Sequence, residues 1–306
     1  MPRRVTNNFN LPAPVVAMVD RNTYTQGDTD VNVTTFIAPP QVTILKEAHK
    51  DNLVVDASDL LYPAWGSTLH EVLFRYGERA DDAVVEEFLT TTDRGIKWGG
   101  HIDLREPSLR TANAHTIADY KMCNTFKAMK VLKGGTNDKE WEQQLNCYCL
   151  LVRRAYPDLE IDALQVIAFL RDWSKTKAQG ADYPPTGVMP VPIPLWSEQE
   201  QEAFVDARLS LWEDQQLRMD AGDPLIPCTD EERWMRPGAW RVKARTNGKT
   251  RRKFDNEMEA KEMVEKDPEK FYIDVTPGIP LRCTHYCDAA TYCDQYQTEL
   301  NQGESK

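Results

Sequence analysis

Long apolar runs are missing from this sequence, and their absence excludes a membrane-spanning helix as an expected element. A helix that crosses a bilayer needs about 20 predominantly apolar residues, and no stretch of the chain approaches that length. The first ten residues contain Arg3 and Arg4 but continue with Asn and Thr, where a signal peptide would have an apolar core. We therefore expect a cytoplasmic protein without a membrane partner.

Positive charge is also scarce, because 37 Lys and Arg face 48 Asp and Glu, for a formal net charge of -11. This balance argues against a protein that coats nucleic acid with its whole surface, but it allows an enzyme whose active site needs carboxylates. The segment 241–253 is a local exception, since it carries seven basic residues and no acid. They are Arg241, Lys243, Arg245, Lys249, Arg251, Arg252 and Lys253.

This basic segment predicts a β-hairpin. Two strand-like runs, 240–246 and 249–254, flank Asn247-Gly248, a dipeptide that favours two-residue hairpin turns. Basic side chains on such a hairpin can contact DNA phosphates, which would orient DNA without reading its sequence. The alternative is a strand pair with a solvated basic face.

Cysteine is sparse, and four of the seven cysteines lie in the C-terminal third of the chain. Disulfides are not expected in a reducing compartment, so the close spacing of Cys283, Cys287 and Cys293 indicates ligation of a metal or a cluster. Cys228 supplies a fourth thiolate if the intervening hairpin module folds back. Four thiolates suit tetrahedral Zn²⁺ and a [4Fe–4S] cluster equally well. We expect the remaining three cysteines, Cys123, Cys147 and Cys149, to be buried or inert thiols.

Apolar periodicity predicts an α/β protein with a mixed central sheet flanked by helices. Its predicted parts are an N-terminal arm over 1–35, an α/β core over 36–225, a cysteine-ligated module with the basic hairpin over 226–297, and a flexible tail over 298–306. Helices are expected over 41–49, 65–77, 138–156, 197–220 and 257–266. Strands are expected over 84–89, 99–104, 117–121, 161–170 and 271–275, with an edge strand over 188–194 whose prolines lack ladder donors.

Two of the predicted strands each carry an acid near the end, Asp103 in the first and Asp119 in the second. Because Asp119 and Lys121 are separated by one residue, they share a strand face, and Tyr120 contributes its backbone carbonyl. Carboxylate and carbonyl oxygens suit Mg²⁺ or Mn²⁺, and the lysine ammonium can orient a water or stabilise charge on a phosphate. The alternative is a hairpin with solvated charges.

Other polar residues accompany this acid pair. His70 lies on the predicted helix 65–77, where a histidine is either a packed core residue or a metal ligand. Gln144 and Tyr148 are four apart on the helix after Lys121, so they share one helix face. Three further acids, Glu71, Glu86 and Glu87, are expected to be solvated charges.

The ordered set H, G-x-x-D, D-x-K and Q-x-x-x-Y, over about residues 36 to 175, resembles the RecB-type branch of the PD-(D/E)XK nucleases. The resemblance implies a restriction-endonuclease-like core and a metal-dependent DNA nuclease, with exonuclease action in repair, recombination or phage DNA processing. It implies one or two Mg²⁺ or Mn²⁺ ions bound by His70, Asp103, Asp119 and the Tyr120 carbonyl. It further implies that Asp103, Asp119 and Lys121 are catalytic and that Gln144 and Tyr148 touch or order DNA.

Many RecB-type nucleases, including the CRISPR-adaptation branch, carry a [4Fe–4S] clasp with one cysteine before the nuclease motifs and three near the C-terminus. Here the C-terminal three have three residues in the first gap where two are usual, and Cys228 follows the core instead of preceding it. The resemblance favours [4Fe–4S] over Zn²⁺, with zinc as the rival and His285 as a substitute ligand.

The resemblance also implies partners. DNA is expected as single strands or duplex ends, together with recombination or replication proteins, and a phage-encoded chain would act in the host cytoplasm. The alternative function is a non-catalytic DNA-binding or adaptor protein of a recombination complex that retains the nuclease fold.

Overall fold

The computed structural model describes residues 4–20, 27–77, 82–133, 139–180 and 182–304. The chain forms two compact units, unit 1 with residues 1–40 and 54–221, and unit 2 with residues 41–53 and 222–306. Residues 41–53, which the sequence placed in the α/β core, belong to unit 2 because Leu45 of α3 (Pro40–Ala48) packs with Ala289 and Cys293. Within the described residues, no helix has the length and apolar content to cross a membrane.

Unit 1 is built on a mixed six-stranded sheet, as the sequence predicted, with the order β2-β5-β6-β7-β8 and β4 paired to β5. Its strands are β2 (Val31–Asn32), β4 (Val84–Asp93), β5 (Ile96–Pro107), β6 (Ala114–Cys123), β7 (Glu160–Leu170) and β8 (Val188–Ile193). The β4–β5, β5–β6 and β7–β8 pairs are antiparallel, whereas β2–β5 and β6–β7 are parallel. The proline-containing β8 pairs only with β7, which confirms the edge strand.

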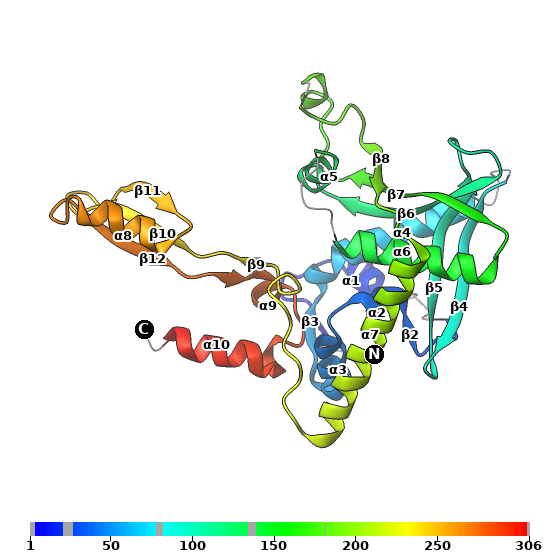
Figure 1. Cartoon of the computed structure of the whole chain (residues 1–306), viewed down its shortest axis with the longest axis horizontal. Helices are drawn as coiled ribbons and strands as arrows, with labels where there is room; N and C mark the ends of the chain where they lie inside the picture. Colours follow the sequence, from blue (N-terminus) through cyan, green and yellow to red (C-terminus); the bar gives the residue numbers. More distant parts are fainter. Residues whose placement is uncertain (1–3, 21–26, 78–81, 134–138, 181, 305–306) are drawn as a thin grey trace. The chain divides into compact units, whose positions relative to one another are not determined.

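Helices flank this sheet (Figure 1). The helices of unit 1 are α1 (Ala13–Asp20), α2 (Val33–Ile37), α4 (Leu61–Gly77), α5 (Thr125–Leu132), α6 (Lys139–Ala155) and α7 (Glu198–Ala221). Of these, α2, α4, α5 and α6 contact strands of the sheet, whereas α1 packs on α4 and α7 packs on α6. Helix α6 contacts β4, β5, β6 and β7, and its Leu145 and Leu150 are fully buried in the main core. A capping box starts α7, since Ser197 N donates to Glu200 Oε2 at 2.8 Å and Glu200 N donates to Ser197 Oγ at 3.3 Å.

The N-terminal arm, a stretch after β6 and the C-terminal tail contain elements that the sequence did not predict. The arm contains α1, together with β1 (Arg4–Thr6), which pairs in parallel with β3 (Val54–Asp56). Helix α5 lies between the strand predicted to end at 121 and the helix predicted to begin at 138, and Asn124 caps it by accepting from Lys127 N at 2.8 Å. The segment predicted as a flexible tail, 298–306, begins inside helix α10 (Asp294–Glu304). The loop predicted over 134–137 lies outside the described residues.

Unit 2 contains a three-stranded antiparallel sheet, order β11-β10-β12. Besides α3, unit 2 contains β9 (Met235–Arg236), β10 (Ala239–Ala244), β11 (Thr250–Phe254), α8 (Glu257–Glu265), β12 (Phe271–Thr276), β13 (Ile279–Pro280), α9 (Leu281–His285) and α10. Strands β10 and β11 confirm the predicted hairpin, and Gly248 in its turn has φ 66°, a conformation that glycine adopts without strain. Short 3-10 turns cover Lys50–Asn52 and Ala290–Tyr292 in unit 2 and Ala57–Leu60 and Lys177–Gln179 in unit 1.

Candidate active site

The two predicted acids lie side by side where the β5–β6 ladder opens. The ladder runs from Pro107↔His115 to Leu104↔Ala118, and Asp103 and Asp119 are the next residues on the two strands. There the Asp103 carboxylate replaces a backbone acceptor, because its Oδ2 accepts from Tyr120 N at 2.7 Å. Both acids are buried, with 6% of the surface of Asp103 and 2% of that of Asp119 exposed. The sequence predicted them near the ends of their strands, but both lie in the interior of longer strands.

His70 of α4 faces Asp103 and a third acid, Glu86. Its Nδ1 lies 3.3 Å from Asp103 Oδ1 and 3.6 Å from Glu86 Oε1. One ligand atom from each of His70, Glu86 and Asp103 lies within 4.8 Å of the others, so these three side chains can hold a metal ion. The prediction that Glu86 is a solvated charge is therefore wrong. Imidazole and carboxylate together suit a divalent cation such as Mn²⁺.

The backbone at Glu86 is unusual for a strand. Its φ is 50°, a left-handed conformation that a side chain rarely adopts within β structure. Two residues that are two apart normally share a strand face, yet Val85 lies against Gly77 of α4 while Glu87 accepts from Tyr156 at the end of α6. Pairing between β4 and β5 also skips Glu86 and resumes at Glu87↔Ile102. Such strain is found where a side chain must be aimed at a functional site.

Asp119 and Lys121 form an ion pair beside this group. Lys121 Nζ lies 2.7 Å from Asp119 Oδ2, and the lysine side chain remains 29% exposed. Burial raises the pKa of Asp119 to about 6, helped by the negative charge of Asp103, although the Lys121 ammonium opposes the shift. Asp119 itself is not part of the group of His70, Glu86 and Asp103, whose ligand atoms lie within 4.8 Å of one another. The site thus consists of a His70–Glu86–Asp103 group and an adjacent acid–lysine pair.

The charge on His70 follows from its neighbours. Burial disfavours the imidazolium, but hydrogen bonds to Asp103 and Glu86 and the negative charges of Asp103 and Asp119 outweigh it and raise the pKa of His70 to about 10. In the metal-free protein His70 is therefore protonated near neutral pH, and its ring also meets the Tyr120 ring edge-to-face at 6.1 Å. A metal ion bound at His70 must displace this proton.

Gln144 and Tyr148 support the site from α6. Gln144 Nε2 donates to the Tyr148 hydroxyl at 3.1 Å, and both residues are buried, with 7% and 4% exposed. A Cβ on Gly100 of β5 would lie 3.3 Å from Tyr148 Cε1, and one on Gly99 would lie 2.2 Å from the Leu89 carbonyl oxygen. The Gly-Gly pair thus allows close packing beside Asp103. The two helix residues share a face as predicted, and their burial suits ordering β5 better than touching DNA directly.

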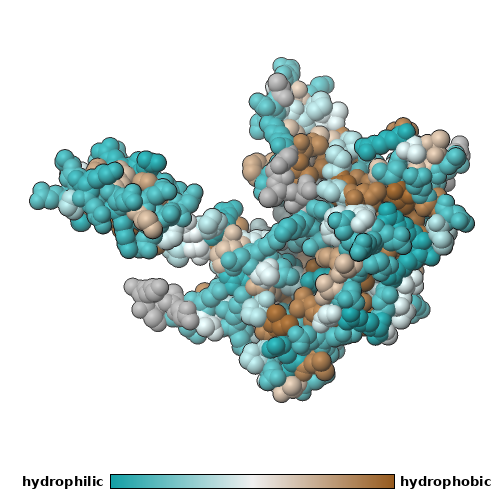
Figure 2. All heavy atoms as spheres, in the orientation of Figure 1, coloured by the Kyte–Doolittle hydropathy of each residue, from teal (hydrophilic) through white to brown (hydrophobic). Residues whose placement is uncertain are grey.

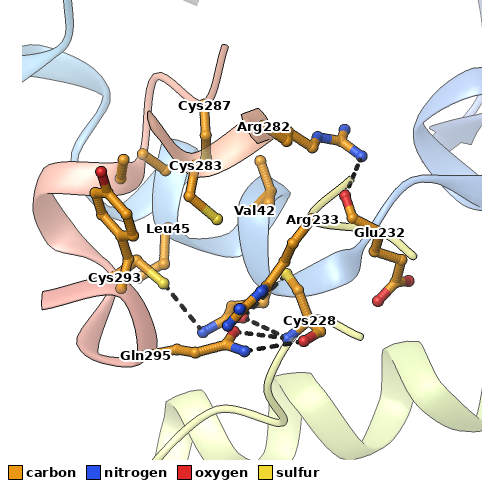
Figure 3. Close-up of a pocket in the computed structure, with 14 residues that line it drawn as sticks. Val42, Leu45, Cys228, Glu232, Arg233, Arg282, Cys283, Cys287, Cys293 and Gln295 are labelled. Carbon is orange, nitrogen blue, oxygen red and sulfur yellow. Dashed lines mark hydrogen bonds between the residues drawn. The ribbon is translucent and has the colours of Figure 1, made fainter. Parts of the chain in front are cut away.

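The four C-terminal cysteines line one pocket in unit 2, together with Gln41, Val42 and Leu45 of α3 (Figure 3). They are Cys228, Cys283, Cys287 and Cys293, and His285 is not among the residues that line this pocket.

Two glutamines order the pocket. The Cys228 amide donates to Gln295 Oε1 at 2.9 Å and to Gln41 Oε1 at 3.1 Å, while Gln41 Nε2 donates to Cys293 Sγ at 3.6 Å. Burial, assisted by Glu232 and the neighbouring thiols, raises the pKa of Cys228 to about 12. The four thiols thus share one pocket with an amide N–H on one sulfur, but they are not among the described groups whose ligand atoms lie within 4.8 Å of one another.

The other predicted residues lie elsewhere. Cys123, Cys147 and Cys149 are buried, as expected, and burial raises the pKa of Cys147 to about 12. Glu87 is not a solvated charge, because it pairs with buried Arg105 at 2.9 and 3.0 Å. The seven basic residues of the segment 241–253 lie on β10, on β11 and in the turn between them.

These observations define a mixed α/β protein that carries a candidate metal site on its central sheet. No protein family model and no curated protein matches the sequence. Among solved structures, the crystal structure of SSO0001 is similar at 14% identity, with a TM-score of 0.41, over 64% of this chain and 84% of that one. That similarity is too distant to indicate a function for this chain.

Proposed function

We propose that this chain is a metal-dependent deoxyribonuclease with a PD-(D/E)XK-type core in unit 1. The observation that carries the proposal is the convergence of His70, Asp103 and Glu86 next to the Asp119–Lys121 pair, on three neighbouring strands and one helix. The sequence order of these groups resembles RecB-type nucleases, and exonuclease action is the mode which that resemblance implies.

Each group has a role in phosphodiester hydrolysis. His70, Glu86 and Asp103 would hold a divalent ion, and Asp119 and the Tyr120 carbonyl would complete the binding of one or two ions. Such an ion supplies a Lewis acid that polarises a phosphoryl oxygen. Lys121, held at 2.7 Å by Asp119, places a cation where negative charge develops on the phosphate or orients the attacking water. Gln144 and Tyr148 keep β5 in place and thereby order the DNA indirectly.

We also propose that the four cysteines hold a [4Fe–4S] cluster, with Zn²⁺ as the rival occupant. The donor set fits either group, and Arg233, only 4% exposed, places a positive charge near Cys283 that would offset thiolate charge. Iron and sulfide analysis of anaerobically purified protein, beside zinc analysis, distinguishes the two. A protein with neither metal would contradict this part of the proposal.

The nuclease is tested with Asp119→Asn and Lys121→Met. Each should lower Mn²⁺-dependent cleavage of DNA by at least about 100-fold, because a positioned charge at the reacting group contributes that much. Glu71→Gln is the matched control, since Glu71 follows His70 directly but is 71% exposed and pairs only with Arg75, at 3.4 Å, among the described residues. End-labelled linear and circular DNA as substrates test the exonuclease mode.

The rival from another class is a DNA-binding adaptor with an inactive site. It is favoured if the parent protein binds DNA but cleaves no substrate with Mn²⁺ or Mg²⁺. Cleavage that persists in both site variants would instead place the activity elsewhere and refute the assignment.

A further inference from the structure

The three-stranded sheet of unit 2 has two different faces. Helix α8 packs on one of them (Figure 1), where Val242, Phe254 and Ala260 form a buried cluster. The partly buried residues packed against this cluster are Trp240, Met263, Val264, Phe271 and Ile273. Since Trp240 and Val242 alternate with Arg241 along β10, the intervening residue faces the other side of the sheet.

This second face is cationic. Arg241 lies opposite Lys253 of β11 and Asp274 of β12, and Lys243 on the same face pairs with Asp274 at 2.7 Å. Arg241 and Lys253 have no carboxylate partner among the described residues, which include this whole sheet. We call the surface formed by Arg241, Lys243 and Lys253 the basic face. The atoms over β10–β12 and α8 are mainly hydrophilic in Figure 2.

The aromatic residues of this sheet do not offer a stacking platform on the basic face. Trp240 packs on the helix side with the buried cluster. Tyr272 lies opposite Lys243 on the basic face, but the Arg245 guanidinium covers its ring at 5.6 Å. Binding of unpaired bases depends on exposed aromatic rings, whereas duplex DNA is held mainly through its phosphates.

We propose that the basic face binds the phosphate backbone of duplex DNA. Charge complementarity selects this occupant, because the basic face presents three cations against one acid, Asp274, in a chain whose net charge is -11. The proposal does not depend on the nuclease assignment, since the face belongs to unit 2 and needs no catalysis.

The structure separates basic residues that the sequence leaves as one run. Arg252 lies opposite Val242, on the α8 side, and its guanidinium rests over the Phe254 ring at 4.7 Å. We therefore assign Arg241 and Lys253 to phosphate contact and exclude Arg252. Lys266, exposed at the end of α8, lies among the helix-side residues and makes a partner for a control.

The test measures duplex binding by full-length protein over a range of salt, in an Asp119→Asn background with no divalent cation added. Arg241→Gln with Lys253→Gln should lower the slope of log affinity against log salt by about 1.8, since each lost phosphate contact removes about 0.9. Raising salt from about 50 to 200 mM would then weaken the parent about 12-fold more than the variant. The control, Arg252→Gln with Lys266→Gln, removes the same charge and should keep the parent slope.

Equal slopes for the two double variants would overturn the proposal, whether both change or neither does. Tighter binding of single-stranded DNA or of RNA than of the duplex would also overturn it. Thermal melting checks that the variants fold. Asp274→Asn offers a test of opposite sign, because it removes the acid of the basic face and frees Lys243, so binding should tighten and the salt slope should rise; unchanged binding would count against the proposal.

Discussion

Replacing Glu86 by glutamine tests whether this strained residue is a metal ligand. Gln keeps the size of the side chain but removes the charge that lies 3.6 Å from His70 Nδ1. If Glu86 binds the ion with His70 and Asp103, the dissociation constant for Mn²⁺ should rise by about 10- to 100-fold, the range for loss of a group that supports a metal site.

Proton competition gives this prediction a characteristic pH dependence. With a metal-free pKa of about 10, His70 must lose a proton on binding, which weakens binding at pH 7 by a factor of about 1,000. The dissociation constant of the parent should therefore fall about tenfold per pH unit between about pH 7 and pH 9. Glu86→Gln removes one hydrogen bond that raises the pKa of His70, so the proton competes less in the variant. The penalty of the substitution should therefore be smaller at pH 7 than at pH 9.

Calorimetric titration with Mn²⁺ at several pH values measures both effects, with Glu71→Gln as the control that should behave like the parent. A variant that binds Mn²⁺ at least as tightly as the parent at both pH 7 and pH 9 would refute the reasoning. That result would show that Glu86 only holds the proton of His70 and does not contact the ion.

Three further predictions concern the rest of the protein. Arg105→Ala should lower the free energy of unfolding by about 3 kcal/mol in chemical denaturation, because it leaves the nearly buried Glu87 carboxylate without its ion partner; a loss below about 1 kcal/mol would contradict this. Gly99→Ala should lower the free energy of unfolding by about 1 to 3 kcal/mol in the same assay, since its Cβ would lie 2.2 Å from the Leu89 carbonyl oxygen. An unchanged denaturation midpoint would contradict this, because it would show that β4 and β5 can move apart. Cys228→Ser should remove most of the bound metal measured by elemental analysis, and full retention would exclude Cys228 as a ligand.

Much of the fold was accessible from local patterns. The apolar run of β7, the prolines of β8 and the hairpin around Asn247-Gly248 each depend on short stretches of sequence, and the structure confirms these strands, with a hairpin turn longer than two residues. Helix α5 was missed because its buried residues are few and its Asn124 cap resembles an ordinary polar loop residue.

The site was accessible only in part. Spacing on β6 correctly placed Asp119 and Lys121 together, and the order of motifs brought in His70. Glu86 could not be found in this way, because its contact with His70 depends on a left-handed backbone that regular strand alternation does not predict. The one local signal was the Glu86-Glu87 pair, which interrupts an apolar strand. Gln41 was equally hidden, since it lies 252 positions before Cys293, to which it donates.

The membership of residues 41–53 in unit 2 makes that unit discontinuous in sequence. The ribosome delivers this segment well before its packing partners Ala289 and Cys293, which lie about 240 residues later in the chain. The apolar side chain of Leu45 therefore stays without these packing partners until they have been synthesised. No single cut of the chain therefore yields two intact units. A fragment that ends near residue 225 keeps Gln41 and Leu45 but loses every cysteine of the pocket. The complementary fragment keeps these cysteines but loses helix α3, which lines the pocket with them.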